Sequence, residues 1–238
     1  MRVTLAIAWK EIVAYYTNPM AYIVSLMFLA LTGFFFVNSI DRPFAEASIS
    51  GMLDPVVFFM MWWLPPLLTM RLLAEEQKLG TLELLLTAPV YDWEVVIGKY
   101  LSSLVFFMTT LALTLYYVLL LYWFGNPDSG PIWSAYLGAI LYGAAALSVG
   151  LLASSLTSNQ IVAAVIGVGL LLLLTFIDLA AGQVGGGLST FLREVGLRSH
   201  FEDFSRGVVD TSNVVYYVAL TAVFLFLTVR SLESRRWR

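Results

Sequence analysis

The chain has 238 residues, of which 60% are hydrophobic and 12% are charged, and its formal net charge is −3. Soluble domains carry about 25% charged residues, so this composition excludes an ordinary soluble domain and is typical of an integral membrane protein. The sequence contains no cysteine, which excludes disulfides, thiolate metal sites and a cysteine nucleophile.

Residues 1–19 are predicted to form a helix that lies in the membrane interface and is not a cleaved signal peptide. Apolar residues recur at helical spacing, at Leu5, Trp9, Ile12 and Tyr16. Lys10 and Glu11 fall on other faces, and inside hydrocarbon each charge would cost about 3 kcal/mol. The alternative, a simple extension of the first membrane span, stays open.

Six apolar runs are long enough to cross a bilayer, which takes roughly 20 residues per helix. They cover residues 20–40, 55–73, 95–124, 132–156, 161–181 and 214–229. The runs are continuous and do not alternate, so they predict helices and not a β-barrel. The fold class is therefore an all-α integral membrane protein, with one domain over residues 1–238. Small residues in the fourth and fifth runs favour close packing, within the bundle or against a second copy.

Two of these runs have unusual features. The second contains Pro65-Pro66, and we expect a kink there because proline removes a backbone donor and clashes with the preceding turn. The third is longer than a bilayer needs, so it is either tilted or extended into water.

The distribution of Lys and Arg predicts the orientation. An even number of spans places both termini on one side, and that side collects most of the basic residues: Arg2, Lys10, Arg71, Lys78, Lys99, Arg230, Arg235, Arg236 and Arg238. The other side has Arg42, Arg193, Arg198 and Arg206. Because loops rich in Lys and Arg stay inside, both termini and the loop of residues 71–99 are predicted to be cytoplasmic.

The loop of residues 71–99 is the one long charged insert between apolar runs. Gly80 or Thr81 can start a short helix, Glu83 suits its positive end, and Pro89 stops it. Leu82, Leu85 and Leu86 share one face of that helix. Physical reasoning alone leaves two interpretations open, a knob that docks on a partner protein or a segment that contacts lipid.

The same loop resembles the cytoplasmic signature of type 2 ABC exporter permeases. The resemblance is carried by Arg71, Glu76, Gly80-Thr81-Leu82-Glu83, Pro89 and Gly98-Lys99. A second segment, with His200, Phe201, Phe204, Arg206, Gly207 and Asp210, resembles the branch found in gliding-motility and nitrous-oxide-reductase maturation operons.

The resemblance implies a coupling helix over residues 80–88 that docks on a separate P-loop ATPase subunit, and a second permease copy or sister permease as partner. Arg71, Glu76 and Lys99 would support the loop, and ATP and Mg would be bound by the ATPase.

The sequence contains no HExxH, GxSxG or P-loop motif, so we expect no enzyme activity and no cofactor in this chain. Its single histidine, His200, lies beside Glu202 and Asp203, which is a weak signal for a metal and favours a solvated or capping role.

Residues 182–212 are predicted to form an extracytoplasmic loop, with a short amphipathic helix over residues 188–196. An ordered loop that merely closes the bundle is the alternative.

The interpretation is a transmembrane permease subunit of an ATP-driven exporter in the inner (plasma) membrane, with lipid around it and no nucleic-acid partner. A non-transporting scaffold or channel-like subunit of a larger complex is the alternative. The sequence leaves the cargo open, and also whether the permeases pair as a homodimer or a heterodimer.

Overall fold

The protein is described by a computed structural model that covers residues 2–40, 50–82, 90–181 and 185–236. Within these ranges the regular structure is helical, and no residue lies in a β-strand. Six helices or pairs of consecutive helices are long and apolar enough to cross a membrane in this part of the chain. The predicted all-α fold with six spans is therefore confirmed.

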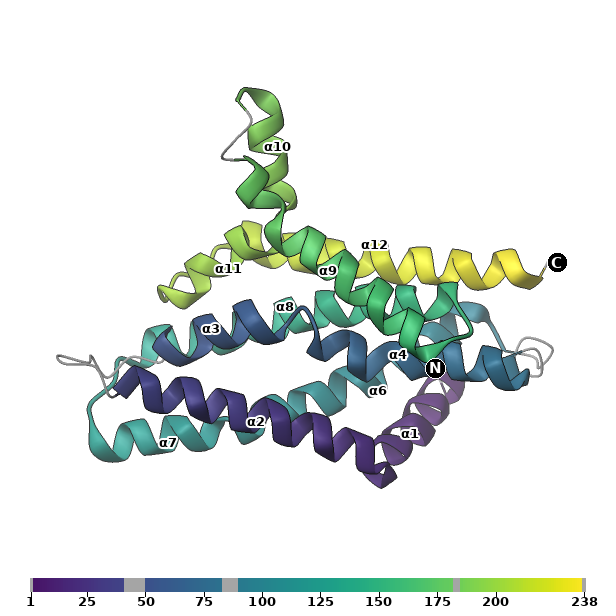
Figure 1. The fold of residues 1–238 in the computed structure, drawn as a ribbon, viewed down its shortest axis with the longest axis horizontal. Helices are drawn as coiled ribbons and strands as arrows, with labels where there is room; N and C mark the ends of the chain where they lie inside the picture. Colours follow the sequence, from purple (N-terminus) through teal and green to yellow (C-terminus); the bar gives the residue numbers. More distant parts are fainter. Residues whose placement is uncertain (1, 41–49, 83–89, 182–184, 237–238) are drawn as a thin grey trace.

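The spans run side by side as a bundle (Figure 1). They are formed by α2 (Pro19–Ile40), α3 (Ser50–Met60) with α4 (Leu64–Leu79), α6 (Asp92–Leu113) with α7 (Leu115–Phe124), α8 (Ser129–Leu156), α9 (Gln160–Ala181) and α12 (Thr211–Arg236). The first helix, α1 (Arg2–Thr17), precedes the spans and packs against α6.

The second span is broken at residues 61–63, a turn that separates α3 from α4. The kink expected at Pro65-Pro66 thus lies just before the two prolines, which occupy the first turn of α4. The reason is that the first turn of a helix has no partners for its N–H groups, so a residue without an N–H is tolerated there.

The third span covers Asp92–Phe124 and is 33 residues long, or roughly 50 Å of helix. It is interrupted at Thr114, which separates α6 from α7. The Thr114 hydroxyl donates to the carbonyl of Leu111 at 2.6 Å and lies 2.9 Å from the hydroxyl of Tyr136 on α8. The long span is therefore divided into two helices at this polar contact.

The central helix of the bundle is α8, which packs against α4, α9 and α12. Glycines on α8 allow this close approach. A Cβ atom at Gly150 would collide with Thr69 on α4, and one at Gly138 would lie 2.6 Å from Phe204. The predicted role of small residues in packing within the bundle is confirmed for α8.

The loop before the last span contains two helices, α10 (Gly187–Val195) and α11 (Leu197–Ser205). The short helix predicted over residues 188–196 is present as α10, whereas α11 was not anticipated. Figure 1 shows α10 projecting away from the bundle. Leu188 and Phe191 on α10 are more than half exposed, while Leu197, Phe201 and Phe204 of α11 are buried.

Candidate functional site

A buried lysine joins three helices at the end of the bundle where α4 finishes and α6 begins. The Nζ atom of Lys99 on α6 lies 2.9 Å from Glu11 Oε1 on α1 and 2.8 Å from Glu76 Oε1 on α4. The Lys99 side chain is 1% exposed, and those of the two glutamates are 14% and 18% exposed. Lys99 therefore fixes α1, α4 and α6 relative to one another.

The residue before this lysine explains how α1 comes so close. A Cβ atom at Gly98 would lie 2.9 Å from Ile7 and 3.0 Å from the backbone oxygen of Thr4, both on α1. Glycine at this position lets the two helices approach until Glu11 reaches Lys99. The Gly98-Lys99 pair of the sequence motif thus has a physical reason, one residue for proximity and the next for charge.

Arg71 makes a second link between α4 and α1. Its guanidinium lies 4.7 Å from the centre of the Tyr15 ring, which is a cation–π distance. The Tyr15 hydroxyl donates to the backbone oxygen of Leu68 at 2.6 Å. Burial raises the pKa of this phenol despite the opposing effect of Arg71, so Tyr15 remains neutral and keeps its proton for that bond.

The two sides of α1 differ in exposure. Thr4, Ala8 and Tyr15 are buried against the bundle, whereas Leu5 and Trp9 of the predicted apolar face are about two-thirds exposed. This arrangement leaves an apolar surface outward, as expected of a helix lying in a membrane interface.

The start of the predicted coupling helix lies next to this cluster. Gly80 has a φ of 70° and ends α4 in the left-handed conformation that glycine adopts without strain. Thr81 and Leu82 follow in helical conformation. Leu82 is 5% exposed and belongs to the core of this chain, although we expected it on an outward face. Glu83, Leu85, Leu86 and Pro89 lie outside the described residues.

Between α1 and α4 the structure has a cleft of about 820 Å³. Its walls carry three basic residues, Lys10, Arg71 and Lys99, and three acidic residues, Glu11, Glu75 and Glu76. Thr81 and Leu79 also line it. All three residues predicted to support the loop, Arg71, Glu76 and Lys99, are therefore brought together here, beside the Gly80 turn.

Sequence reasoning missed the contribution of α8 to this end. The Ser154 hydroxyl accepts hydrogen bonds from the backbone N–H groups of Leu73 and Ala74 and donates to the carbonyl of Met70. The Gln77 side chain donates to the carbonyl of Ser155 at 3.0 Å. A serine on an apolar run carries little signal in sequence, since small residues there also serve helix packing.

His200 lies at the opposite end of the bundle, on α11. Its Nδ1 lies 2.7 Å from Asn213 Oδ1, its Nε2 lies 3.1 Å from the carbonyl of Glu194, and its ring stacks on Tyr216 at 3.8 Å. The carbonyl of Glu194 lies in the last turn of α10, so this contact fits the capping role suggested for His200, whereas two protein partners do not fit the solvated role. Among the described residues no group of three or more candidate ligands is placed to hold a metal ion.

Comparison with known proteins identifies relatives. The sequence model of the family described as "ABC-2 type transporter" matches residues 2–177, a range that contains the Lys99 cluster and the cleft. A protein of Escherichia coli (strain K12) named "Probable multidrug ABC transporter permease YbhR" is 32% identical over 87 residues, which is 37% of this chain and 23% of that protein. The protein of the same name in Escherichia coli O157:H7 matches to the same extent. The match thus spans less than a quarter of the length of these curated relatives.

Proposed function

The chain belongs to the ABC-2 type transporter family, and from this premise we propose that it is the transmembrane permease subunit of an ATP-driven exporter. The family membership and the six apolar helices make it a multi-pass membrane protein. The observation that carries the proposal is the family match over residues 2–177, which includes the three-helix cluster beside the predicted coupling segment.

The proposed energy source is a separate P-loop ATPase that binds ATP and Mg, because this sequence contains no P-loop motif. Residues 80–88 would form the coupling helix that docks on it. A push on this helix would reach α4 directly and α1 and α6 through Lys99, so three helices would respond together. ATP must favour one arrangement of the permeases over another for this movement to do work.

The proposed assembly has two permease chains, identical or sister chains. Large parts of α2, α9 and α12 are exposed in the single chain. In the most apolar stretch of each helix, 28%, 22% and 17% of the residues, respectively, are buried. These faces are available to lipid and to a second permease. The proposed location is the inner (plasma) membrane with both termini cytoplasmic, and the His200–Asp210 segment supports assignment to the gliding-motility and nitrous-oxide-reductase maturation branch.

The coupling proposal is tested by changing the segment that would dock. We expect Leu85→Asp and Glu83→Arg each to weaken association with the ATPase and to uncouple hydrolysis from transport, because a central apolar anchor at an interface can contribute about 2 kcal/mol or more. The measurements are co-purification with the ATPase and ATP-driven transport in proteoliposomes.

A matched control is Leu188→Asp, which introduces the same charge at an exposed leucine of α10, at the other end of the bundle. It should leave ATPase association unchanged. If Leu85→Asp retains the ATPase at high dilution and transports normally, the loop is not the coupling element. If the wild-type chain binds no ATPase at all, the scaffold interpretation replaces the exporter.

A further inference from the structure

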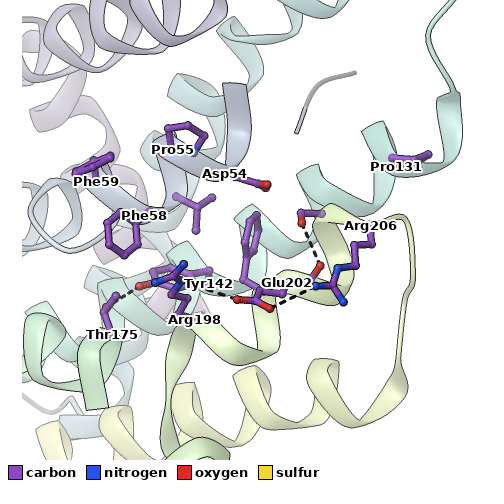
Figure 2. Close-up of a pocket in the computed structure, with 13 residues that line it drawn as sticks. Asp54, Pro55, Phe58, Phe59, Pro131, Tyr142, Thr175, Arg198, Glu202 and Arg206 are labelled. Atoms are coloured by element: carbon purple, nitrogen blue, oxygen red, sulfur yellow. Dashed lines mark hydrogen bonds and ion pairs between the residues drawn. The ribbon is translucent and has the colours of Figure 1, made fainter. Parts of the chain in front are cut away.

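A cavity of about 760 Å³ lies at the end of the bundle opposite the Lys99 cluster. Figure 2 shows the residues that line it. Its walls come from α3, α8, α9 and α11. The volume falls within the range of sites that bind small molecules, roughly 300–1,000 Å³. Nothing in the coupling role of the other end requires a cavity here.

The deep part of the cavity is apolar. Val57, Tyr142 and Phe201 are each at most 5% exposed and line it. The Tyr142 hydroxyl is already paired with the Thr175 hydroxyl at 2.8 Å, as Figure 2 shows, so the two polar groups satisfy each other. This part therefore offers hydrophobic contact to a ligand.

One rim of the cavity carries a charged set on α11. Glu202 Oε1 lies 4.0 Å from Arg198 Nε, and Glu202 Oε2 lies 3.7 Å from Arg206 Nη2. These separations are longer than a charge-assisted hydrogen bond, so the guanidinium groups retain donors for an anion. Arg198 also lies 4.8 Å from the centre of the Phe58 ring, at the border between the charged rim and the apolar wall.

The wall formed by α3 carries an acid, Asp54, that lines the same cavity. Its Oδ1 atom is buried and has no hydrogen-bond partner among the described residues. A buried carboxylate oxygen without a donor is unfavourable, and a cationic donor on a ligand would satisfy it. The cavity therefore offers an acceptor on α3 and two guanidinium groups, one from Arg198 on α11 and one from Arg206, the residue that follows α11.

We propose that this cavity binds a zwitterionic amphiphile, with its ammonium at Asp54, its phosphate or carboxylate at Arg198 and Arg206, and its apolar part against Val57, Tyr142 and Phe201. The rim contains two bases and one acid, and the α3 wall contains Asp54, so a ligand with a single charge would satisfy one of these two walls and leave the other unsatisfied. As a cargo site the cavity rests on the proposed export function, but binding itself requires no ATPase.

The proposal is tested by equilibrium binding to the purified full chain in non-ionic detergent. The probe is a lysophosphatidylethanolamine, compared with a lysophosphatidic acid of the same chain length, which lacks the ammonium, and with the alkylamine of that length, which lacks the phosphate. We expect the zwitterion to bind at least about tenfold more tightly than either comparison probe, because it alone satisfies both walls.

Two variants separate the walls. Asp54→Asn should weaken the zwitterion about tenfold while leaving the lysophosphatidic acid unchanged, and Arg198→Gln should weaken both phosphate-bearing probes while leaving the alkylamine unchanged. Glu194→Gln and Arg193→Gln, matched changes on α10 outside the cavity, should have no effect. Arg206→Gln provides a second basic-side variant at a side chain that is 71% exposed, where folding is not at risk.

The proposal is wrong if the zwitterion binds no more tightly than the singly charged probes, or if Asp54→Asn and Arg206→Gln both leave its affinity unchanged. If the chain does not bind the zwitterion but supports ATP-driven transport, the cavity is not a binding site for this ligand and the exporter proposal stands. If the chain binds the zwitterion but associates with no ATPase, the exporter proposal is wrong and the proposed binding site stands.

Discussion

The Lys99 side chain is almost completely buried, and two carboxylates from other helices lie 2.9 Å and 2.8 Å from its Nζ atom. A buried ion pair is weak evidence of net stabilisation, since desolvation costs offset the attraction. Removing one member is a different matter, because the charges that remain lose their partner. At the residue scale this makes the cluster a device for fixing the positions of α1, α4 and α6.

We expect Lys99→Met to destabilise the protein by about 3–5 kcal/mol, because Glu11 and Glu76 would then face each other without a cation. The variant in which Glu11→Gln and Glu76→Gln accompany Lys99→Met should recover much of this loss. Equilibrium unfolding in mixed micelles measures both. Lys78→Met, at an exposed lysine of α4, is the control, and an equal loss in the single and triple variants would contradict the interpretation.

The residues of this cluster were only partly predictable. The sequence motif points to Arg71, Glu76 and Lys99, but the sequence marks Glu11 only as a polar residue of an interfacial helix. Its pairing with Lys99 spans 88 positions in the sequence, and no local pattern records such a distance. Asp54 gives no signal for a different reason, because it lies one residue before the apolar run of residues 55–73.

At the scale of elements, α8 organises the bundle through its small residues. The apolar runs were sufficient to predict the spans, because each helix must satisfy its backbone polar groups within the membrane. They were not sufficient to predict the break at residues 61–63, since the prolines mark where a helix can begin as well as where it bends. The helix α11 is short and carries six charged or polar residues among nine, so no apolar run revealed it.

We expect Gly150→Ala to destabilise the bundle by about 1–3 kcal/mol, because the added methyl group meets Thr69 and the backbone of Pro66. Gly169→Ala, on α9, is the matched control, since nothing lies within 4 Å of its added Cβ. Unfolding in mixed micelles should show a loss for the first variant and little change for the second. Equal effects would mean that α8 is not packed as closely as described.

At the scale of the whole molecule, the start of α1, the end of α12 and the C-terminal end of α4 lie toward one end of the bundle, and α11 lies toward the other (Figure 1). The cavity is lined by residues of α11 and therefore belongs to that second end. This arrangement agrees with the even number of spans expected from the sequence. The side of the membrane that each end faces remains a prediction from the distribution of Lys and Arg.

The orientation in the membrane is tested by introducing single cysteines, because the native sequence contains none that would react. Ser189→Cys, on α10, should react with an impermeant thiol reagent added to intact cells, and Ser234→Cys, near the end of α12, should react after the cells are opened. Labelling of Ser234→Cys from outside would reverse the orientation. The unmodified chain provides the background signal.

The turn at residues 61–63 divides the second span into two helices, α3 and α4, that can change their angle to each other at this turn. The helix α4 is linked to α1 and α6 by the ion pairs of Lys99, and α3 forms a wall of the cavity. Both α3 and α4 pack against α8. Hinges are short segments that absorb changes in backbone angle. A displacement of α4 would therefore change the tilt of α3, and with it the shape of the cavity, without a translation of the whole span.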